Sequence, residues 1–384
     1  MGHEVHILAA SFSHLRKENP MPPKGNKASC WSEQIDGIHY HWLSTPAYAG
    51  NGVGRVRNIA AFLLRAFSAW KSLSGDAKPE LIIASSTSPM DTLLARHIVK
   101  RTKARWVYEV HDLWPLSLIE LNGMSKAHPF VLLCQNAENF AYKHADFVVS
   151  MLPKVHDHMA AHGLDLQKLH IIPNGTSPED WESSPLPLPD EIAECLQSIH
   201  SKGRFRVGYA GSHGIPNALD ELLDTAKLLR EEAVDFVLVG DGHEKKRLLQ
   251  RVEQEQIHNV HMFPPIPKAA IPSFLQHIDL AYLGWKPMPI YRFGIAPNKL
   301  FDYMMAERPV LHVVDAGNDP VKDSGCGHSI PPGNPQHIAK EIRKMMLQSE
   351  HELRLLGEKG KEFVLNHHTY PVLARNFLHP FLNA

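Results

Sequence analysis

The chain has 384 residues, of which 43% are hydrophobic and 21% are charged, and its formal net charge is −1 at pH 7. This length suits two domains of ordinary size, and this balance excludes a disordered chain. Because lysines and arginines are spread along the chain without forming a basic field, the composition also argues against a nucleic-acid-binding protein.

The cysteines follow neither a metal-binding nor a disulfide spacing, which fits a reducing cytoplasm. Histidine is frequent, at 26 residues, but the closest pairs in the sequence have no neighbouring cysteine or acidic partner that would complete a metal site. We therefore expect no metal and no cofactor. No apolar run is long enough to span a bilayer, and the first residues lack the shape of a signal peptide.

Short apolar runs alternate with helical patterns along the first half, which is typical of a parallel α/β sheet. The predicted strands are Val5–Ala9, Leu81–Ala84, Trp106–Val110, Phe147–Ser150 and His170–Ile172. The predicted helices are Val56–Leu73, Asp91–Lys103, Pro129–Lys143 and Lys154–His162. We predict a first domain over residues 1–178, followed by a proline- and serine-rich linker over residues 179–202.

The second half repeats the alternation. Its predicted strands are Phe205–Ala210, Phe236–Val239, Val260–Phe263, Leu280–Leu283, Val310–Val314 and Gly327–Ile330. Its predicted helices are Leu219–Glu231, Glu244–Gln256, Ile271–Gln276, Asn298–Glu307 and Gln336–Gln348. The pattern predicts a second domain over residues 203–348 and a helical tail over residues 349–384.

The helix predicted over residues 55–73 carries apolar side chains, among them Phe62, Phe67 and Trp70, together with several basic ones. Such a helix can lie on an anionic membrane surface. The alternative, which we favour, is a domain helix packed on its own sheet.

The most informative stretch runs from Phe293 to Tyr303 and indicates a loop followed by a short helix. Pro297 suits the first turn of that helix, and Asn298 follows it. Lys299 lies near the positive end of the helix dipole, where a bound phosphate would offset the unfavourable position of a cation. Asp302 lies one turn further along the same face. A cation beside a phosphate, with a carboxylate one turn away, suits a nucleoside diphosphate and its ribose; the alternative is a core helix with a surface ion pair.

Two further motifs follow predicted strands. His111 and Asp112 come after the strand ending at Val110, and ligands of open α/β sheets bind beyond such carboxyl ends. His111 can bond a sugar hydroxyl or stabilise developing charge, and Asp112 can orient it or contact an acceptor; the alternative is a strand-end turn with a polar cap. Gly211 and Ser212 follow the first strand of the second domain, where a glycine lets the backbone approach a phosphate or a sugar.

The stretch Ala296 to Tyr303 resembles the donor-binding segment of GT-B glycosyltransferases of family 4, the retaining glycosyl group 1 type. In the subgroup that builds bacterial polysaccharides and O-antigens, this segment reads like Ser-Pro-Asn-Lys-Leu-x-Glu-Tyr. The residues from Val110 to Pro115 are similar to the family's strand ending in His-Asp and followed by Leu-Trp-Pro, where the histidine faces the donor sugar. Gly52 and Arg55 belong to a loop similar to a Gly-Asn-Gly…Arg loop of the subgroup, which suggests acceptor handling.

The resemblance implies an α/β GT-B fold, with two Rossmann-like domains, a cleft between them and a C-terminal helical tail. It implies transfer of a hexosyl or N-acetylhexosaminyl group, with retention and without a metal, from a nucleotide-sugar that we expect to be UDP-linked. The expected acceptor is a lipid-linked glycan or a polysaccharide. The expected location is the cytoplasm, with peripheral contact to the inner face of the membrane as the alternative placement.

The chain departs from the family pattern at four places. Asp302 stands where the family has a second glutamate, Gly294 where it has the first, and Glu307 where it has the glycine of Gly-x-Pro-Val. The start of the chain resembles the family's second strand, which a first strand, a Gly-rich loop and a helix usually precede. We therefore expect a chain that starts about one β-α unit late and transfers sugar poorly.

Two other functions fit the same residues. A nucleotide-sugar epimerase of similar two-domain fold would bind the same donor and need no acceptor. A non-catalytic nucleotide-sugar binder would bind the donor without turnover. A glycan product with release of UDP distinguishes the transferase from both.

Overall fold

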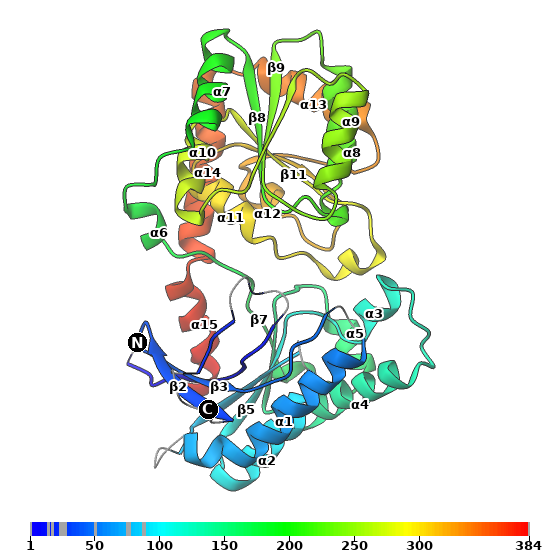
Figure 1. The fold of residues 1–384 in the computed structure, drawn as a ribbon, viewed down its shortest axis with the longest axis vertical. Helices are drawn as coiled ribbons and strands as arrows, with labels where there is room; N and C mark the ends of the chain where they lie inside the picture. The colour runs from blue at the N-terminus through cyan, green and yellow to red at the C-terminus, as the bar shows by residue number, and fades with distance from the viewer. Residues whose placement is uncertain are drawn as a thin grey trace. The chain divides into compact units, whose positions relative to one another are not determined.

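The computed structural model describes residues 2–13, 16, 19–22, 29–49, 52–73, 78–86 and 90–382. The chain divides into two compact units. Unit 1 contains residues 1–150 and 156–170, and unit 2 contains residues 151–155 and 171–384. Each unit combines β-sheet with covering helices (Figure 1), as the alternating sequence pattern predicts.

Unit 1 holds two sheets. The first has the order β1-β3-β2, with β1 (His6–Ala10) parallel to β3 (Ile38–Leu43) and β2 (Cys30–Ile35) antiparallel to β3. The second has the order β4-β5-β6-β7, formed by β4 (Leu81–Ser85), β5 (Arg105–Val110), β6 (Phe147–Ser150) and β7 (Leu169–Ile171). The hairpin of β2 and β3 was not among the predicted elements. Its turn is Asp36-Gly37, with both residues at positive φ, which is a favoured two-residue hairpin turn.

The helices of unit 1 are α1 (Val53–Leu73), α2 (Asp91–Thr102), α3 (Leu116–Glu120), α4 (Pro129–His144) and α5 (His156–Ala161). Helix α1 buries Ala66 and Trp70 against Leu43 of β3 and against α2, with Phe62 and Phe67 packed beside them. The apolar face of α1 is therefore used inside unit 1, as the packing interpretation predicts. None of the helices in the described ranges is both long and apolar enough to cross a membrane.

Unit 2 is built on a six-stranded parallel sheet with the order β10-β9-β8-β11-β12-β13. Its strands are β8 (Phe205–Ala210), β9 (Val234–Val239), β10 (Val260–Phe263), β11 (Leu280–Gly284), β12 (Val310–Val313) and β13 (Gly327–Ile330). All six lie where the sequence predicts strands. The strand order reverses between β8 and β11, and ligands of such sheets bind beyond the strand ends at that switch point.

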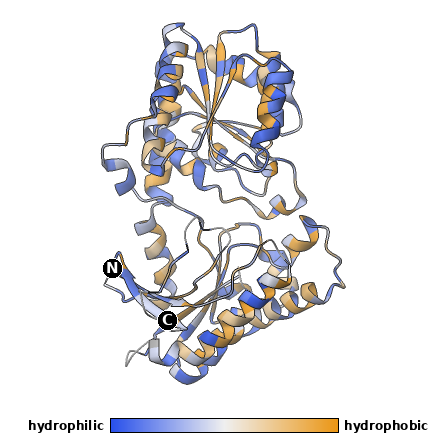
Figure 2. Ribbon diagram, in the orientation of Figure 1, coloured by the Kyte–Doolittle hydropathy of each residue, from blue (hydrophilic) through white to orange (hydrophobic). Residues whose placement is uncertain are grey.

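Helices cover both faces of this sheet (Figure 1). One face carries α8 (Leu219–Leu228), α9 (Lys245–Gln254) and α13 (Pro335–Met346), and the other carries α7 (Asp190–Ser201), α10 (Ile271–Gln276), α11 (Asn298–Met305) and α14 (Glu350–His367). The remaining helices are α6 (Glu179–Glu182), α12 (Pro320–Ser324) and α15 (Tyr370–Leu382). Figure 2 shows apolar strands enclosed by helices whose outer faces are polar.

The segment predicted as a linker, residues 179–202, differs from that description in its second half. Helix α7 occupies residues 190–201, and its Ile192, Leu196 and Ile199 are buried in the core of unit 2. Their spacing of four and three residues places them on one helix face, whereas the prolines before residue 190 are typical of a linker. The expectation of a missing unit before β1 stays a prediction.

Glu307, at the position where the family pattern has glycine, adopts a φ of 53° at the end of α11. This left-handed conformation favours glycine, because a Cβ there approaches the backbone. Its carbonyl oxygen also lies so close to α14 that a Cβ added to Gly357 would meet it at 2.0 Å. The turn between α11 and β12 is therefore strained at residue 307 and tightly packed.

We predict that Glu307→Gly raises the free energy of unfolding by about 1 kcal/mol, because it removes a left-handed residue that carries a Cβ. The lost contact from Lys361 to the Glu307 carboxylate is partly exposed and contributes little. Urea denaturation followed by circular dichroism measures the change. The matched control is Ala306→Gly, whose φ of −77° is ordinary and which should destabilise by about 0.5–1 kcal/mol. Equal losses in both variants would contradict the strain at residue 307.

Candidate nucleotide-sugar site

The loop after β8 and the start of α11 meet at the carboxyl end of the sheet in unit 2. The hydroxyl of Tyr303, on α11, accepts a hydrogen bond from the Ala210 backbone N–H at 3.0 Å and donates to the Ala210 carbonyl at 3.3 Å. Tyr303 is fully buried, so this pair of bonds fixes α11 against the last residue of β8. The switch point of the sheet lies here, between β8 and β11.

Lys299 is a half-buried cation, and its side chain pairs with no carboxylate in the part of the chain that the structure describes. Its Nζ donates to the Tyr209 hydroxyl at 3.0 Å and to Asn217 Oδ1 at 2.6 Å, and it lies 4.9 Å from the centre of the Tyr209 ring. Burial lowers the pKa of Lys299 to about 8. Because these two partners are neutral and the adjacent helix end is positive, an anion bound here would gain from the ammonium and from the dipole of α11.

Gly211 and Ser212 shape the space around Lys299. Gly211 has a φ of +155°, and a Cβ added to it would lie 3.2 Å from both Cε and Nζ of Lys299. The Ser212 carbonyl accepts from the Tyr209 hydroxyl at 2.6 Å and from Asn217 Nδ2 at 2.9 Å. The structure therefore brings Gly211, Ser212 and Lys299 together, as the sequence predicts. It adds Tyr209 and Asn217, which sequence analysis missed.

Pro297 and Asn298 lie at the start of α11. Pro297 has φ −78° and ψ 112°, so it caps the helix from outside, and the first helical residue is Asn298. The predicted start of the helix at Asn298 is confirmed, whereas Pro297, expected to suit the first turn, is the residue just before it, because its extended ψ cannot continue a helix. Pro297 provides no side-chain cap for α11, and the side chain of Asn298 is exposed.

Asp302 is a half-buried carboxylate one turn beyond Lys299. Burial raises its pKa to about 6, a shift that Lys268 opposes and Asp180 reinforces. Lys268 is paired with Asp180 at 2.7 Å. The side-chain bonds of Lys299 go to Tyr209 and Asn217, so Lys299 and Asp302 do not form the surface ion pair of the alternative interpretation.

Gly294 stands where the family has a glutamate, and its surroundings account for the difference. Its φ is +114°, which strains any residue with a side chain. A Cβ built on Gly294 would lie 2.5 Å from Cδ of Pro153 and 3.0 Å from Oδ1 of Asn318. This backbone therefore excludes a glutamate at residue 294.

The turn Gly240-Asp241-Gly242 after β9 packs directly on the loop after β8. A Cβ on Gly240 would lie 1.8 Å from the Gly211 carbonyl oxygen, and one on Gly242 would lie 2.4 Å from that of His213. His213 is fully buried between them, and neither of its ring nitrogens has a partner in the part of the chain that the structure describes. Burial lowers the pKa of His213 to about 4, so its ring is neutral at pH 7. The loop after β8 and the turn after β9 are therefore packed tightly against each other.

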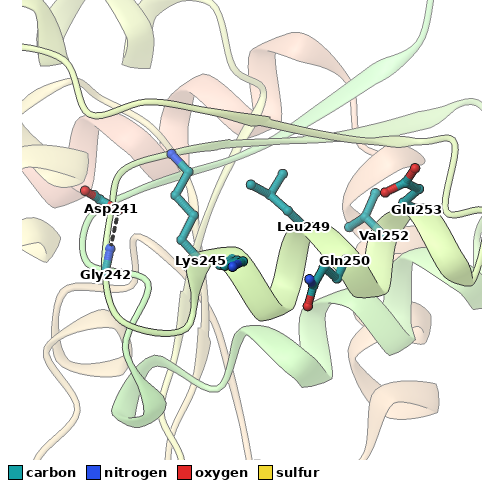
Figure 3. A pocket seen from close by; sticks show the side chains of 8 residues that line it. Asp241, Gly242, Lys245, Leu249, Gln250, Val252 and Glu253 are labelled. Carbon is teal, nitrogen blue, oxygen red and sulfur yellow. Dashed lines mark hydrogen bonds between the residues drawn. The ribbon is translucent and has the colours of Figure 1, made fainter.

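An open pocket of about 650 Å³ lies beside this turn but outside the Lys299 site. Figure 3 shows its lining side chains, which project from the turn at Asp241 and from successive turns of α9. Lys245 turns its Nζ toward the carbonyls of Gly240 and Phe263, at 2.6 and 2.7 Å. Neither Lys299 nor Gly211 lines this pocket, so we do not assign the nucleotide to it.

In unit 1, His111 lies at the carboxyl end of β5. Its Nε2 is 3.0 Å from Glu109 Oε2, and its backbone N–H donates to the buried Ser86 hydroxyl at 2.9 Å. The hydrogen bond to Glu109 raises the pKa of His111, although burial opposes the shift. The carboxylate bonded to this histidine is thus Glu109, whereas the sequence suggested Asp112. The side chain of Asp112 is exposed.

Arg55 lies close to the same strand end. Its guanidinium is 5.9 Å from the centre of the Trp114 ring, three residues after His111. Its backbone N–H donates to the carbonyl of Gly52 at 3.0 Å, so Gly52 forms the turn that starts α1. Residues 50 and 51 of the predicted Gly-rich loop lie outside the described residues. The structure therefore brings Arg55 and His111 to one region of unit 1.

Comparisons with known proteins agree with this architecture. Residues 1–175 match the model of a glycosyl transferase 4-like domain, and residues 204–348 match that of glycosyl transferases group 1. The probable glycosyltransferase WbjE of Pseudomonas aeruginosa is 23% identical over 286 residues, which are 73% of this chain and 70% of WbjE. The putative colanic acid biosynthesis glycosyl transferase WcaI of Escherichia coli (strain K12) is 22% identical over 283 residues, covering 72% of this chain and 68% of WcaI.

Solved structures share the fold. Sucrose-phosphate synthase from Thermosynechococcus elongatus superposes with a TM-score of 0.69 at 15% identity, over 94% of this chain and 86% of that one. HepE from Anabaena, in complex with UDP and glucose, gives a TM-score of 0.63 at 17% identity, over 91% and 87%. Two α/β units, matched in turn by two glycosyltransferase domain models and by solved structures of the same fold, lead to one conclusion: the chain belongs to the GT-B glycosyltransferases.

Proposed function

We propose that the chain transfers a hexosyl or N-acetylhexosaminyl group from a UDP-linked sugar to a lipid-linked glycan or polysaccharide. The observation that carries this proposal is Lys299, a half-buried ammonium at the N-terminus of α11 whose hydrogen bonds go to the neutral groups of Tyr209 and Asn217. In the proposal the diphosphate binds between Lys299 and the loop at Gly211, against the first N–H groups of α11. Asp302, one turn away, accepts a hydrogen bond from the ribose.

The proposed reaction proceeds with retention and without a metal or other cofactor. Charge develops on the leaving diphosphate as the glycosidic bond breaks, and Lys299 with the helix dipole stabilises it in place of a divalent ion. The diphosphate then helps to accept the proton of the attacking hydroxyl, so the site needs no pair of catalytic carboxylates of the hydrolase type. His111, kept protonated to higher pH by Glu109, donates to the sugar. Arg55 and Gly52 contact the acceptor.

Comparisons with known proteins support the proposed donor and the proposed class of acceptor. HepE is a structural neighbour that was solved with UDP and with UDP-glucose. The relatives WbjE and WcaI carry names of glycosyltransferases, and that of WcaI refers to colanic acid biosynthesis. An epimerase would release no UDP and form no glycan, so one assay for both products distinguishes the proposal from that alternative.

The first prediction concerns the charge of Lys299. Lys299→Ala should weaken UDP binding by about 1.5–3 kcal/mol, the range for hydrogen bonds to charged groups, which is about 10- to 150-fold in Kd. Calorimetric titration with UDP measures the change. Lys246→Ala is the matched control, because it removes an exposed charge of unit 2 that lines only the pocket on α9. Unchanged binding in Lys299→Ala, or an equal loss in the control, would refute the assignment.

The second prediction concerns pH. Lys299 has a pKa of about 8, and bound UDP favours its charged form. The affinity for UDP should therefore fall as the pH rises from about 7 through 8 to about 9, a range in which the diphosphate itself no longer titrates. Lys299→Met keeps the length of the side chain and should remove this dependence. A wild-type affinity for UDP that does not change over this range would contradict the assignment of Lys299 to the diphosphate.

The third prediction concerns His111. His111→Ala should lower kcat far more than it weakens donor binding, as expected for a contact that strengthens in the transition state. Glu109→Gln should move the basic limb of the pH profile to lower pH, because without the carboxylate His111 loses its proton sooner. Steady-state kinetics with UDP release as the signal test both variants. If His111→Ala turns over at the wild-type rate, His111 is not catalytic and only caps the end of the strand.

A further inference from the structure

Glu4, His6 and His39 come together at one corner of the three-stranded sheet in unit 1. His6 of β1 is the direct partner of His39 on β3, and Glu4 lies two residues before His6. His6 Nε2 is 2.9 Å from Glu4 Oε1, and His39 Nε2 is 3.8 Å from the same oxygen. One ligand atom from each residue lies within 4.8 Å of the other two, and no other such group of three occurs in the described ranges.

Strand geometry explains why these side chains converge. Side chains two residues apart along a strand project from the same face, and those of paired residues lie side by side on that face. The rings of His6 and His39 stack with their centres 4.8 Å apart and their planes at 16°. The two Nε2 atoms therefore point the same way, toward the Glu4 carboxylate. The cluster needs residues more than thirty positions apart, which is why spacing along the sequence did not indicate it.

The outer contacts of His6 suit a metal ligand. Its Nδ1 is 2.9 Å from His41 Nε2, and His41 Nδ1 is 2.7 Å from the Ser32 hydroxyl. His41 is buried, so its ring is fixed in position. When His6 Nδ1–H donates to His41, the lone pair of His6 Nε2 is free for a metal, and metal-bound histidines usually have such an outer acceptor.

We infer that Glu4, His6 and His39 bind a zinc ion through one carboxylate oxygen and two imidazole nitrogens, with His41 and Ser32 orienting His6. Two histidines and a carboxylate are a zinc ligand set, and a fourth position is left for water. The side chains of Glu4 and His6 are 62% and 29% exposed, so solvent and an ion reach the cluster. The bound ion would tie β1 to β3. This inference is independent of the proposed sugar transfer.

A second cluster in unit 2 provides a control within the same chain. His328 Nδ1 and His337 Nε2 lie 3.1 and 3.8 Å from oxygens of Glu341, much as in the first cluster. There, however, Lys344 Nζ lies 2.6 Å from the same Glu341 carboxylate, and a cation already occupies the place of a metal. The double variant His328→Ala/His337→Ala therefore removes two comparable histidines without removing the proposed site.

The test is a zinc titration of the full chain without an affinity tag, in competition with a chelating dye. The expected result is one zinc ion per chain, with binding weakened about tenfold or more in each of His6→Ala, His39→Ala and Glu4→Gln, and unchanged in the His328→Ala/His337→Ala control. Equal affinity in wild type and the three variants, or the same loss in the control, would overturn the inference. Glu4→Gln is nearly isosteric, so its result does not depend on refolding around a lost ring.

A second measurement uses bound cobalt as a spectroscopic probe. Cobalt(II) in the wild type should give a visible absorption band that zinc displaces, whereas the three cluster variants should show none. Zinc should also raise the thermal midpoint of the wild type but not of the variants, because a ligand held only by the native state stabilises it. Magnesium, which prefers oxygen ligands, should have no effect. A wild type without the cobalt band, or equal stabilisation by magnesium, would overturn the assignment.

Discussion

The two hydrogen bonds between the Tyr303 hydroxyl and the main chain of Ala210 determine where α11 begins relative to β8. Lys299 lies one turn before Tyr303, so the same bonds bring its ammonium over the loop at Gly211. The absence of a Cβ at residue 211 leaves room there for the end of the lysine side chain. Removing the tyrosine hydroxyl would leave the Ala210 N–H buried and unpaired, which is costly. The geometry of the candidate site thus depends on a residue that need not touch a ligand.

Much of unit 2 could be predicted from its sequence, because buried parallel strands form continuous apolar runs that helices separate. The prediction failed where burial is one-sided. Strand β2 has a mixed polar sequence, since Trp31 is the one buried residue on it, and its pairing with β3 depends on the turn Asp36-Gly37. Helix α7 was hidden by the prolines that precede it, although its apolar spacing was visible.

In the candidate site, too, some residues could be predicted from the sequence and others could not. Lys299, Gly211 and Ser212 could be found because each follows a local rule about helix ends or strand ends. Tyr209 and Asn217 could not, because their contacts with Lys299 span 90 and 82 positions. Glu109 was within reach of sequence reasoning: it lies two residues before His111, on the same face of an extended segment. The adjacent Asp112 is the worse candidate for bonding His111, since neighbouring residues on a strand project to opposite faces.

The surroundings of Gly294 limit how a glutamate, the residue of the family pattern, could replace it during evolution. The positive φ of Gly294 and the contact that Pro153 would make with any Cβ there act together. A change to glutamate alone would be strained by the backbone and blocked by the proline ring, so it would be selected against whatever benefit the carboxylate brings. A change at Pro153 alone would bring no carboxylate. Residues 153 and 294, far apart in sequence, are therefore expected to evolve as a coupled pair. The proline at residue 153 would have to be replaced before a glutamate at residue 294 could be accommodated.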